Sequence, residues 1–172
     1  MRVIACRTFF LMVLFAVAGP ALAADSVSGQ FALDGKPPLK PAEIAAFRVH
    51  DSFHPGKTST LVMLTAKPVD RSAIAKSAYP EVAAINDAAV WETDYIQIFV
   101  DAEGKVSFNA KFGGKQYAHS SQMGLLASCT SNTPEHVACT VKTSEPVKLM
   151  DDPSWSADLT FNSAVIANSA PK

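Results

Sequence analysis

The chain of 172 residues carries 15 basic and 16 acidic residues, so its formal net charge is only −1. That balance excludes the basic footprint expected of a nucleic-acid-binding protein. The length suits one domain with a substantial core, and we find neither an internal repeat nor a low-complexity segment. We therefore expect a single globular domain and no nucleic-acid partner.

The first 23 residues are typical of a secretory signal peptide. Arg2 and Arg7 precede an apolar run from Phe9 to Ala18, and Ala21-Leu22-Ala23 has the small-x-small pattern that a signal peptidase reads. A membrane anchor is the alternative, but this run is about half of the ~20 apolar residues that a bilayer requires. Cleavage after Ala23 removes two basic residues and no acid, which leaves 149 of the 172 residues and a net charge of −3. No later segment is long and apolar enough to span a membrane, so we expect a periplasmic or secreted protein.

Two cysteines remain after the leader, which contains Cys6. Cys129 and Cys139 are ten residues apart, and an even count in an exported chain indicates a disulfide. A redox pair is the alternative, but this spacing is not the C-x-x-C that tunes thiolate reactivity. We predict a structural disulfide that stabilises the fold by about 3 kcal/mol on the chain-entropy estimate.

Alternation of apolar and polar residues, with Gly, Pro, Asn and Asp between the runs, predicts strands along most of the mature chain. In the first strand Phe31 and Leu33 alternate with polar neighbours until Asp34-Gly35 turns the chain. The second, Ile44 to Phe53, has Phe47, Val49 and Phe53 on one face. The segment Leu61 to Ala66 is apolar on both faces, as a central strand would be.

A helical insertion is expected between Pro68 and Trp91. Asp70 suits the N-cap of a first short helix, and Pro80 suits the first turn of a second. In the second helix Val82, Ile85 and Ala89 fall on one stripe, which predicts the buried side.

The remaining strands follow the insertion. Gly104 supplies the positive φ for a hairpin loop between Tyr95–Asp101 and Val106–Phe112, and Gly113-Gly114 ends the second strand. Three further strands are expected, near Gly124–Cys129, His136–Thr143 and Trp155–Ile166.

About eight strands and one insertion predict a mainly β protein. We expect an antiparallel β-sandwich, immunoglobulin-like or Greek-key, or a partly open barrel, with a short helical insertion around 70–91. The signal peptide covers 1–23, the single domain 24–168 and a disordered tail 169–172. The Cys–Trp–Cys order of true immunoglobulin domains is absent, because Trp91 precedes both mature cysteines and Trp155 follows them.

Three motifs carry a resemblance to known exported proteins. VSGQFALDGKPPL resembles the first hairpin of carboxypeptidase-regulatory-like, transthyretin-related domains. The same stretch, with LTAKPV at Leu64 to Val69 and WSADLTF from Trp155, is similar over most of the mature chain to a group of uncharacterised Gram-negative secreted proteins. The second resemblance implies a sandwich fold and carries over no catalytic residue.

The segment HDSFH is the best candidate for a metal site. His50, Asp51 and His54 are residue types that bind zinc or copper. Spacing i, i+4 joins two histidines on a helix, but four residues of an extended strand span about 13 Å. Shared ligation would need a turn at 51–53, or a third ligand from His119 or His136. The favoured interpretation is a polar strand end before Pro55-Gly56; a metal site and acid–base chemistry are the alternatives, and no cofactor is expected.

Catalytic motifs are missing from the sequence. Neither G-x-S-x-G nor H-E-x-x-H occurs. His119 precedes Ser120 and Ser121, but neighbours on a strand point to opposite faces. Glu92 and Asp94 could form an acid pair, although solvated residues are the simpler interpretation, and Asp151-Asp152 suits a turn. We predict that the protein is not an enzyme, and keep a hydrolase with dispersed catalytic residues as a third hypothesis.

The loop between the cysteines is the candidate recognition segment. Asn132, Glu135 and His136 lie in it, and the disulfide would pre-order it for binding. Alternatively, the disulfide only compensates for a small core. The first hypothesis is an exported non-enzymatic protein that binds a protein, a peptide or envelope material; the second is a small periplasmic metal-binding protein that uses His50 and His54.

Overall fold

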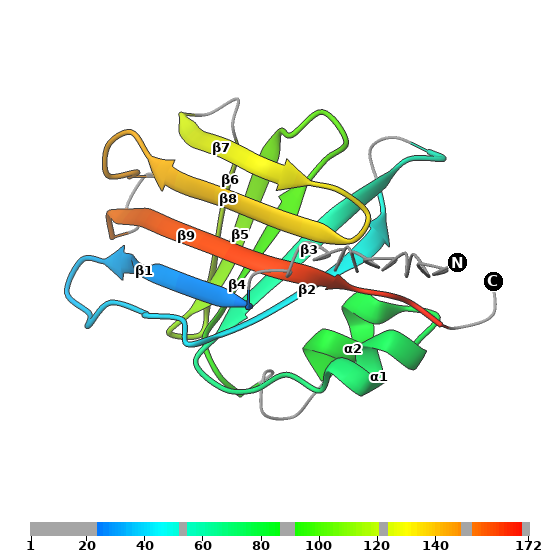
Figure 1. The fold of residues 1–172 in the computed structure, drawn as a ribbon. Helices are drawn as coiled ribbons and strands as arrows, with labels where there is room; N and C mark the ends of the chain where they lie inside the picture. The colour runs from blue at the N-terminus through cyan, green and yellow to red at the C-terminus, as the bar shows by residue number, and fades with distance from the viewer. Residues whose placement is uncertain (1–23, 52–54, 87–91, 121–123, 149–152, 170–172) are drawn as a thin grey trace, which may run out of the picture.

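The computed structural model describes residues 24–51, 55–86, 92–120, 124–148 and 153–169. Two described helices, α1 (Arg71–Lys76) and α2 (Pro80–Asn86), lie together at one side of the sheet (Figure 1), and strands account for most of the described chain. The strands are β1 (Ser26–Leu33), β2 (Glu43–His50), β3 (Thr58–Thr65), β4 (Tyr95–Val100), β5 (Val106–Phe112), β6 (Lys115–Ser120), β7 (Leu125–Asn132), β8 (His136–Thr143) and β9 (Trp155–Ile166).

These strands form one mixed sheet that curls into a half-barrel. The order is β6-β5-β4-β3-β2-β9-β8-β7, and β1 pairs with β9 beside this path. Strands β1, β9, β8 and β7 lie in front of β2 to β6 in Figure 1, so the two halves of the sheet face each other. The mainly β prediction is confirmed. The antiparallel sandwich is not confirmed, because β2 and β9 pair in parallel through Ala46–Val165 and Phe47–Ile166 and join both halves.

The helical insertion was predicted at the right place. Asp70 caps α1 by accepting a hydrogen bond from the Ala73 N–H at 2.9 Å, and Pro80 opens α2. The predicted buried stripe of α2 is wrong at Val82, which is 51% exposed while Ala84 is fully buried. Ile85, also predicted, is partly buried and packs against the core beneath the helices. The helix ends at Asn86, and Ala89 lies outside the described residues. A six- or seven-residue helix has few turns, so tertiary contacts rather than periodicity choose its buried side.

Strand β6 was missed by the sequence prediction. Gly113 and Gly114 both have positive φ, 58° and 80°, and form the two-residue loop of a β5–β6 hairpin instead of ending the sheet. This pattern is the one that a tight hairpin requires of both central residues.

The sheet has two hydrophobic cores because part of it is buried on both faces. The inner core fills the curl and includes Phe31, Phe108 and Trp155, whose ring centroids lie within 5.7 Å of one another. The outer core lies between the helices and β2–β4, and α1 contributes Ile74. We call the outward side chains of β2–β4 beneath the helices the covered face; they are Ala45, Phe47, Val49, Leu61, Met63 and Tyr95.

The predicted disulfide joins neighbouring strands. Cys129 on β7 and Cys139 on β8 are register partners, with their sulfurs at 2.06 Å and their Cα atoms at 4.0 Å. At the other end of the domain, Ser169 donates its N–H to Ala75 O at 2.8 Å, so the first residue of the expected tail contacts α1. Among the helices of the described part, none is long and apolar enough to cross a membrane.

Candidate binding surface

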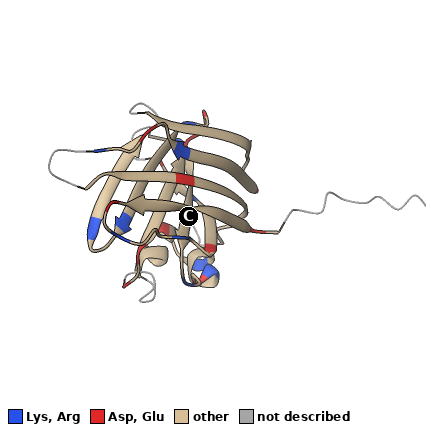
Figure 2. Ribbon diagram, turned by 90° about the vertical axis from the view of Figure 1, so that its left-hand side faces the viewer, with Lys and Arg blue, Asp and Glu red and all other residues tan. Residues whose placement is uncertain are grey.

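The outward side of β1, β9, β8 and β7 is not covered by either helix. Alternation directs Phe31, Leu159 and Val141 into the inner core, so their neighbours face outward. The ribbons of these four strands are mostly tan in Figure 2, because Lys142 and Asp158 are their only charged residues. We call this side the open face; its residues are Ser28, Gln30, Ser156, Asp158, Thr160, Asn162, His136, Ala138, Thr140, Lys142, Leu126, Ser128 and Thr130.

Hydroxyl groups run in a row across the open face. The register aligns Ser28, Thr160, Thr140 and Ser128 on four successive strands, which are about 4.8 Å apart. The Thr140 and Thr160 hydroxyl oxygens are 3.2 Å apart and share a hydrogen bond. The row therefore presents small hydrogen-bonding groups at strand spacing.

Two hollows lie on this same half of the molecule. The larger, of about 480 Å³, spans β7, β8 and β9 and has no Asp, Glu, Lys or Arg among its described lining residues, which include Thr140, Thr160 and Asn162. The smaller, of about 420 Å³, is lined by Gly29, Gln30, Lys40 and Asp158. Both hollows involve β9, so one extended ligand could contact both.

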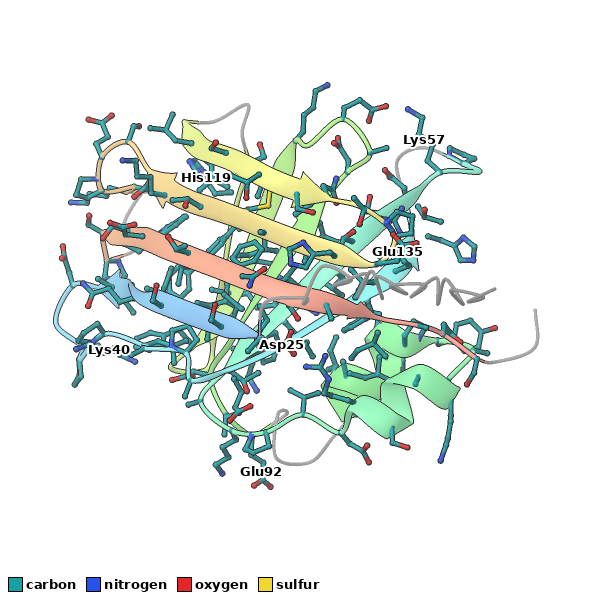
Figure 3. The ribbon with its side chains drawn as sticks, in the orientation of Figure 1. Asp25, Lys40, Lys57, Glu92, His119 and Glu135 are labelled. Carbon is teal, nitrogen blue, oxygen red and sulfur yellow. A yellow bond between two sulfur atoms is a disulfide. The ribbon has the colours of Figure 1, made fainter. Side chains whose placement is uncertain are left out.

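A hydrogen-bond chain sits at the edge of the larger hollow. Asn162 donates its Nδ2 to Ala24 O at 3.3 Å, and this orients its Oδ1 to accept from His136 Nε2 at 2.6 Å. Next to it, the Asp25 carboxylate accepts from the Ala164 N–H at 2.9 Å and pairs with Arg71 of α1 at 2.6 Å. Asp25 thus occupies the point where β9 changes partner from β1 to β2; Figure 3 labels it there.

The three residues of the predicted recognition loop lie at the turn between β7 and β8 and point in different directions. Asn132 points inward, where its amide accepts from the Thr60 hydroxyl at 3.2 Å and donates to Asp101 O at 2.8 Å. Glu135 is exposed, and its backbone oxygen accepts from Val165 N at 2.8 Å. Of the three, His136 alone lies on the open face, and a role of the three in partner binding stays a prediction.

Asn132 belongs to a polar network at one end of the half-barrel. Arg48 of β2 donates to the Thr60 hydroxyl at 2.7 Å and to Thr58 O at 2.9 Å. The Thr60 hydroxyl in turn donates to the side-chain oxygen of Asn132 on β7. Partial burial lowers the pKa of the Arg48 guanidinium from its ordinary value. The network ties the two halves of the sheet together, which is a structural role.

The HDSFH segment lies where β2 ends. The strand stops at His50 rather than at Phe53, and His50 is exposed while Phe47 and Val49 are buried on the opposite side, as predicted. The Asp51 N–H donates to Lys57 O at 3.1 Å and closes the loop to β3, and Ser59 donates to the Asp51 carboxylate at 3.2 Å. Phe53 and His54 lie outside the described residues. Within the described ranges, no three His, Cys, Asp or Glu side chains gather as a metal site would require.

The candidate catalytic residues do not converge either. His119 points into the aromatic inner core, with its ring 5.4 Å from that of Trp155, while Ser120 lies on the other face of β6. Asp94 accepts the Gly113 N–H at 2.8 Å and supports the β5–β6 turn, and Glu92 points away from the domain in Figure 3. Ser121, Asp151 and Asp152 are not among the described residues.

Comparison with protein-family models gave no matching family, and neither the search of curated proteins nor that of solved structures gave a match. The interpretation of the open face as a binding surface therefore rests on its geometry alone. Sequence reasoning noticed its β9 part, since Ser156, Asp158 and Thr160 alternate with apolar residues. It missed the cross-strand row, because only the register places Thr140 and Ser128 beside Thr160.

Proposed function

We propose that this is an exported, non-enzymatic binding protein whose recognition surface is the open face. The observation that supports this proposal most strongly is the difference between the two outward faces of the sheet. The outward side of β2–β4 is apolar and buried under α1 and α2, whereas that of β1, β9, β8 and β7 offers hydroxyls and amides to solvent and contains both hollows.

The arrangement of the open face supports binding rather than catalysis. Its hydrogen-bonding groups lie on paired strands, and the Cys129–Cys139 disulfide links two of those strands. A surface that is ordered before binding loses little conformational entropy when a partner docks. Catalysis would instead need a nucleophile, or an acid and a base, gathered in one concave site.

Paired arginine substitutions test this function. Thr140→Arg with Thr160→Arg places two long charged side chains in the centre of the hydroxyl row. The matched control, Gln116→Arg, adds a charge at an exposed position on β6. The wild type and the control should recover the same specific partner from a periplasmic extract, and the double variant should not. Equal recovery by all three, or no specific partner for the wild type, would contradict the proposal.

Export has its own test. Protein purified from the periplasm or the medium of cells that express the full chain should begin at Ala24. An intact leader on protein held in the cytoplasm would contradict this part of the proposal.

A metal site at His50, Asp51 and His54 is the second candidate function, favoured by one observation. The Asp51 N–H donates to Lys57 O at 3.1 Å, so Asp51 begins a closed loop and does not continue β2. Calorimetric titration of zinc and copper should give saturable binding that His50→Ala/His54→Ala abolishes. Equal binding by both proteins, or none by the wild type, rejects this candidate.

A further inference from the structure

We infer that two copies of this chain pair edge to edge through β7, as antiparallel strands related by a twofold axis at Ala127. This inference goes beyond the proposed function and does not depend on it, because it concerns the backbone edge of β7 rather than the side chains of the open face. The partner is a second copy of the chain.

The first step is the direction of the β7 backbone groups. The Cα atoms of Cys129 and Cys139 are 4.0 Å apart, the short spacing of a pair that does not exchange backbone hydrogen bonds. The N–H and C=O of Cys129 therefore point away from β8. Alternation gives Leu125 and Ala127 the same direction, so three residues present their backbone groups at the outer edge.

The bonding of the other strands gives the same result independently. Asp34 N donates to Ser154 O at 2.9 Å, so the even-numbered residues of β9 bond to β1 and the odd-numbered residues bond to β8. Phe161 then bonds to Cys139, its register partner. A residue of β8 that bonds to β9 cannot also bond to β7, which leaves the backbone of Cys129 directed outward.

The second step is that no described strand pairs along this edge. Among the described strands, β8 alone pairs with β7, which forms the rim of the half-barrel in Figure 1. Within the described part of the chain, no backbone bond reaches the outer edge of Leu125–Cys129. The register shift between Cys129 and Ser131 ends the regular run, so the available edge is five residues long.

The third step is that the regular run of β7 carries neither charge nor proline. Natural edge strands carry lysine, proline or other charged residues that prevent pairing with another chain. Strand β7, LLASCTSN, has no charged residue and no proline, and Leu126 is 49% exposed. A second β7 would meet neither charge repulsion nor a missing N–H.

The fourth step is that the edge complements itself. Antiparallel pairing centred on Ala127 sets Ala127 opposite its own copy and Leu125 opposite the Cys129 of the second copy. These are the three residues whose backbone groups face outward, so each pair exchanges both of its hydrogen bonds. The same register places exposed Leu126 opposite Ser128 of the second copy, and the twofold symmetry closes the assembly at two copies.

The edge at the opposite end of the strand order, that of β6, fits less well. Strand β6 has six residues and includes Lys115, whereas β7 has eight and none charged. Pairing β7 with β6 of another copy would also be head-to-tail, which produces open chains rather than a closed dimer. The structure thus favours β7 with β7.

Sedimentation equilibrium of the mature chain over a concentration series tests the inference. Ala127→Pro removes an N–H that no backbone bond among the described residues uses, so the fold should survive, as circular dichroism will show. The matched control, Ala118→Pro, removes the corresponding outward N–H from β6. We expect a reversible dimer of the wild type that Ala127→Pro weakens at least about tenfold, because the twofold axis loses two donors, and that Ala118→Pro leaves unchanged.

A second variant keeps the test decisive if proline disrupts the fold. Ala127→Lys sets two like charges against each other at the axis and should also weaken the dimer, while Ala127→Ser should not. A wild type that stays monomeric at millimolar concentration overturns the inference, as does a dimer weakened by Ala118→Pro but not by the Ala127 variants. A monomer whose β7 amides become protected from exchange only with a foreign protein overturns it too, and assigns the edge to that protein's strand.

Discussion

The two outward faces of the sheet differ in burial: helices cover one of them, and the other is exposed to solvent. On β2–β4, Phe47 and Met63 are buried beneath two short helices, and the strands carry apolar residues on both sides. On β7–β9, Thr140 and Thr160 meet solvent, and only the inward side is apolar. The difference shows how the chain uses its few helical residues. They bury β2–β4, which have two apolar faces, and leave β7–β9, which have one.

The covered face should respond to truncation far more strongly than the open face. Phe47→Ala removes a ring that is 1% exposed and should lower the free energy of unfolding by about 3–5 kcal/mol. Thr160→Ala should change it by no more than about 0.5 kcal/mol. Urea unfolding followed by fluorescence measures both, and similar losses would contradict the distinction between the faces.

Removing the disulfide should lower the free energy of unfolding by less than Phe47→Ala does. Its effect should fall on the half of the sheet that carries the open face. Cys129→Ala with Cys139→Ala should lower the free energy of unfolding by about 3 kcal/mol, because the unfolded chain regains the freedom of the closed loop. Hydrogen exchange should accelerate in β7 and β8 before it does in β2–β4. Unchanged stability, or faster exchange beginning under the helices, would show that the bond does not hold this half together.

Asp25 lies where the two halves meet, and its loss should have an intermediate effect. Asp25→Ala breaks the pair with Arg71 and leaves the Ala164 N–H without its acceptor, which should cost about 1–2 kcal/mol. Asp34→Ala, in the exposed β1 turn, is the control. If both variants have the stability of the wild type, Asp25 does not stabilise the point where β9 changes partner from β1 to β2.

The covered face should also respond to alkaline pH. Burial raises the pKa of Tyr95 above its ordinary value, so the folded chain retains the phenolic proton at pH values where the unfolded chain loses it. This stability is fully present below about pH 10 and declines as pH rises toward the folded-state pKa. Tyr95→Phe should make the decline shallower. Unfolding curves at about pH 8 and about pH 11 measure it, and an equally steep decline in the variant would remove Tyr95 as its cause.

Local patterns in the sequence predicted much of the fold. Alternation located eight of the strands, and Asp70 and Pro80 marked the helix starts. The strand and the strand pairing that the sequence did not predict depend on contacts between distant segments. Gly113-Gly114 reads equally as an end or as a turn, and the parallel pairing of β9 with β2 leaves no local signal.

The candidate surface was less predictable for the same reason. The recognition loop was placed from the disulfide and its polar composition, yet the direction of Asn132 is set by Thr60, which is 72 residues away in sequence. His136 reaches the open face because it is the first residue of β8 and faces Asn162 on β9. Register between strands, which no single strand encodes, assembles the hydroxyl row.

Hydrogen exchange of the protein, alone and with a partner captured from periplasmic extract, tests the central claim most directly. The proposed function predicts slower exchange with the partner in β1, β9, β8 and β7, and unchanged exchange in α1, α2 and β2–β4. Protection confined to the helices and the covered half would contradict the assignment of the open face as the recognition surface.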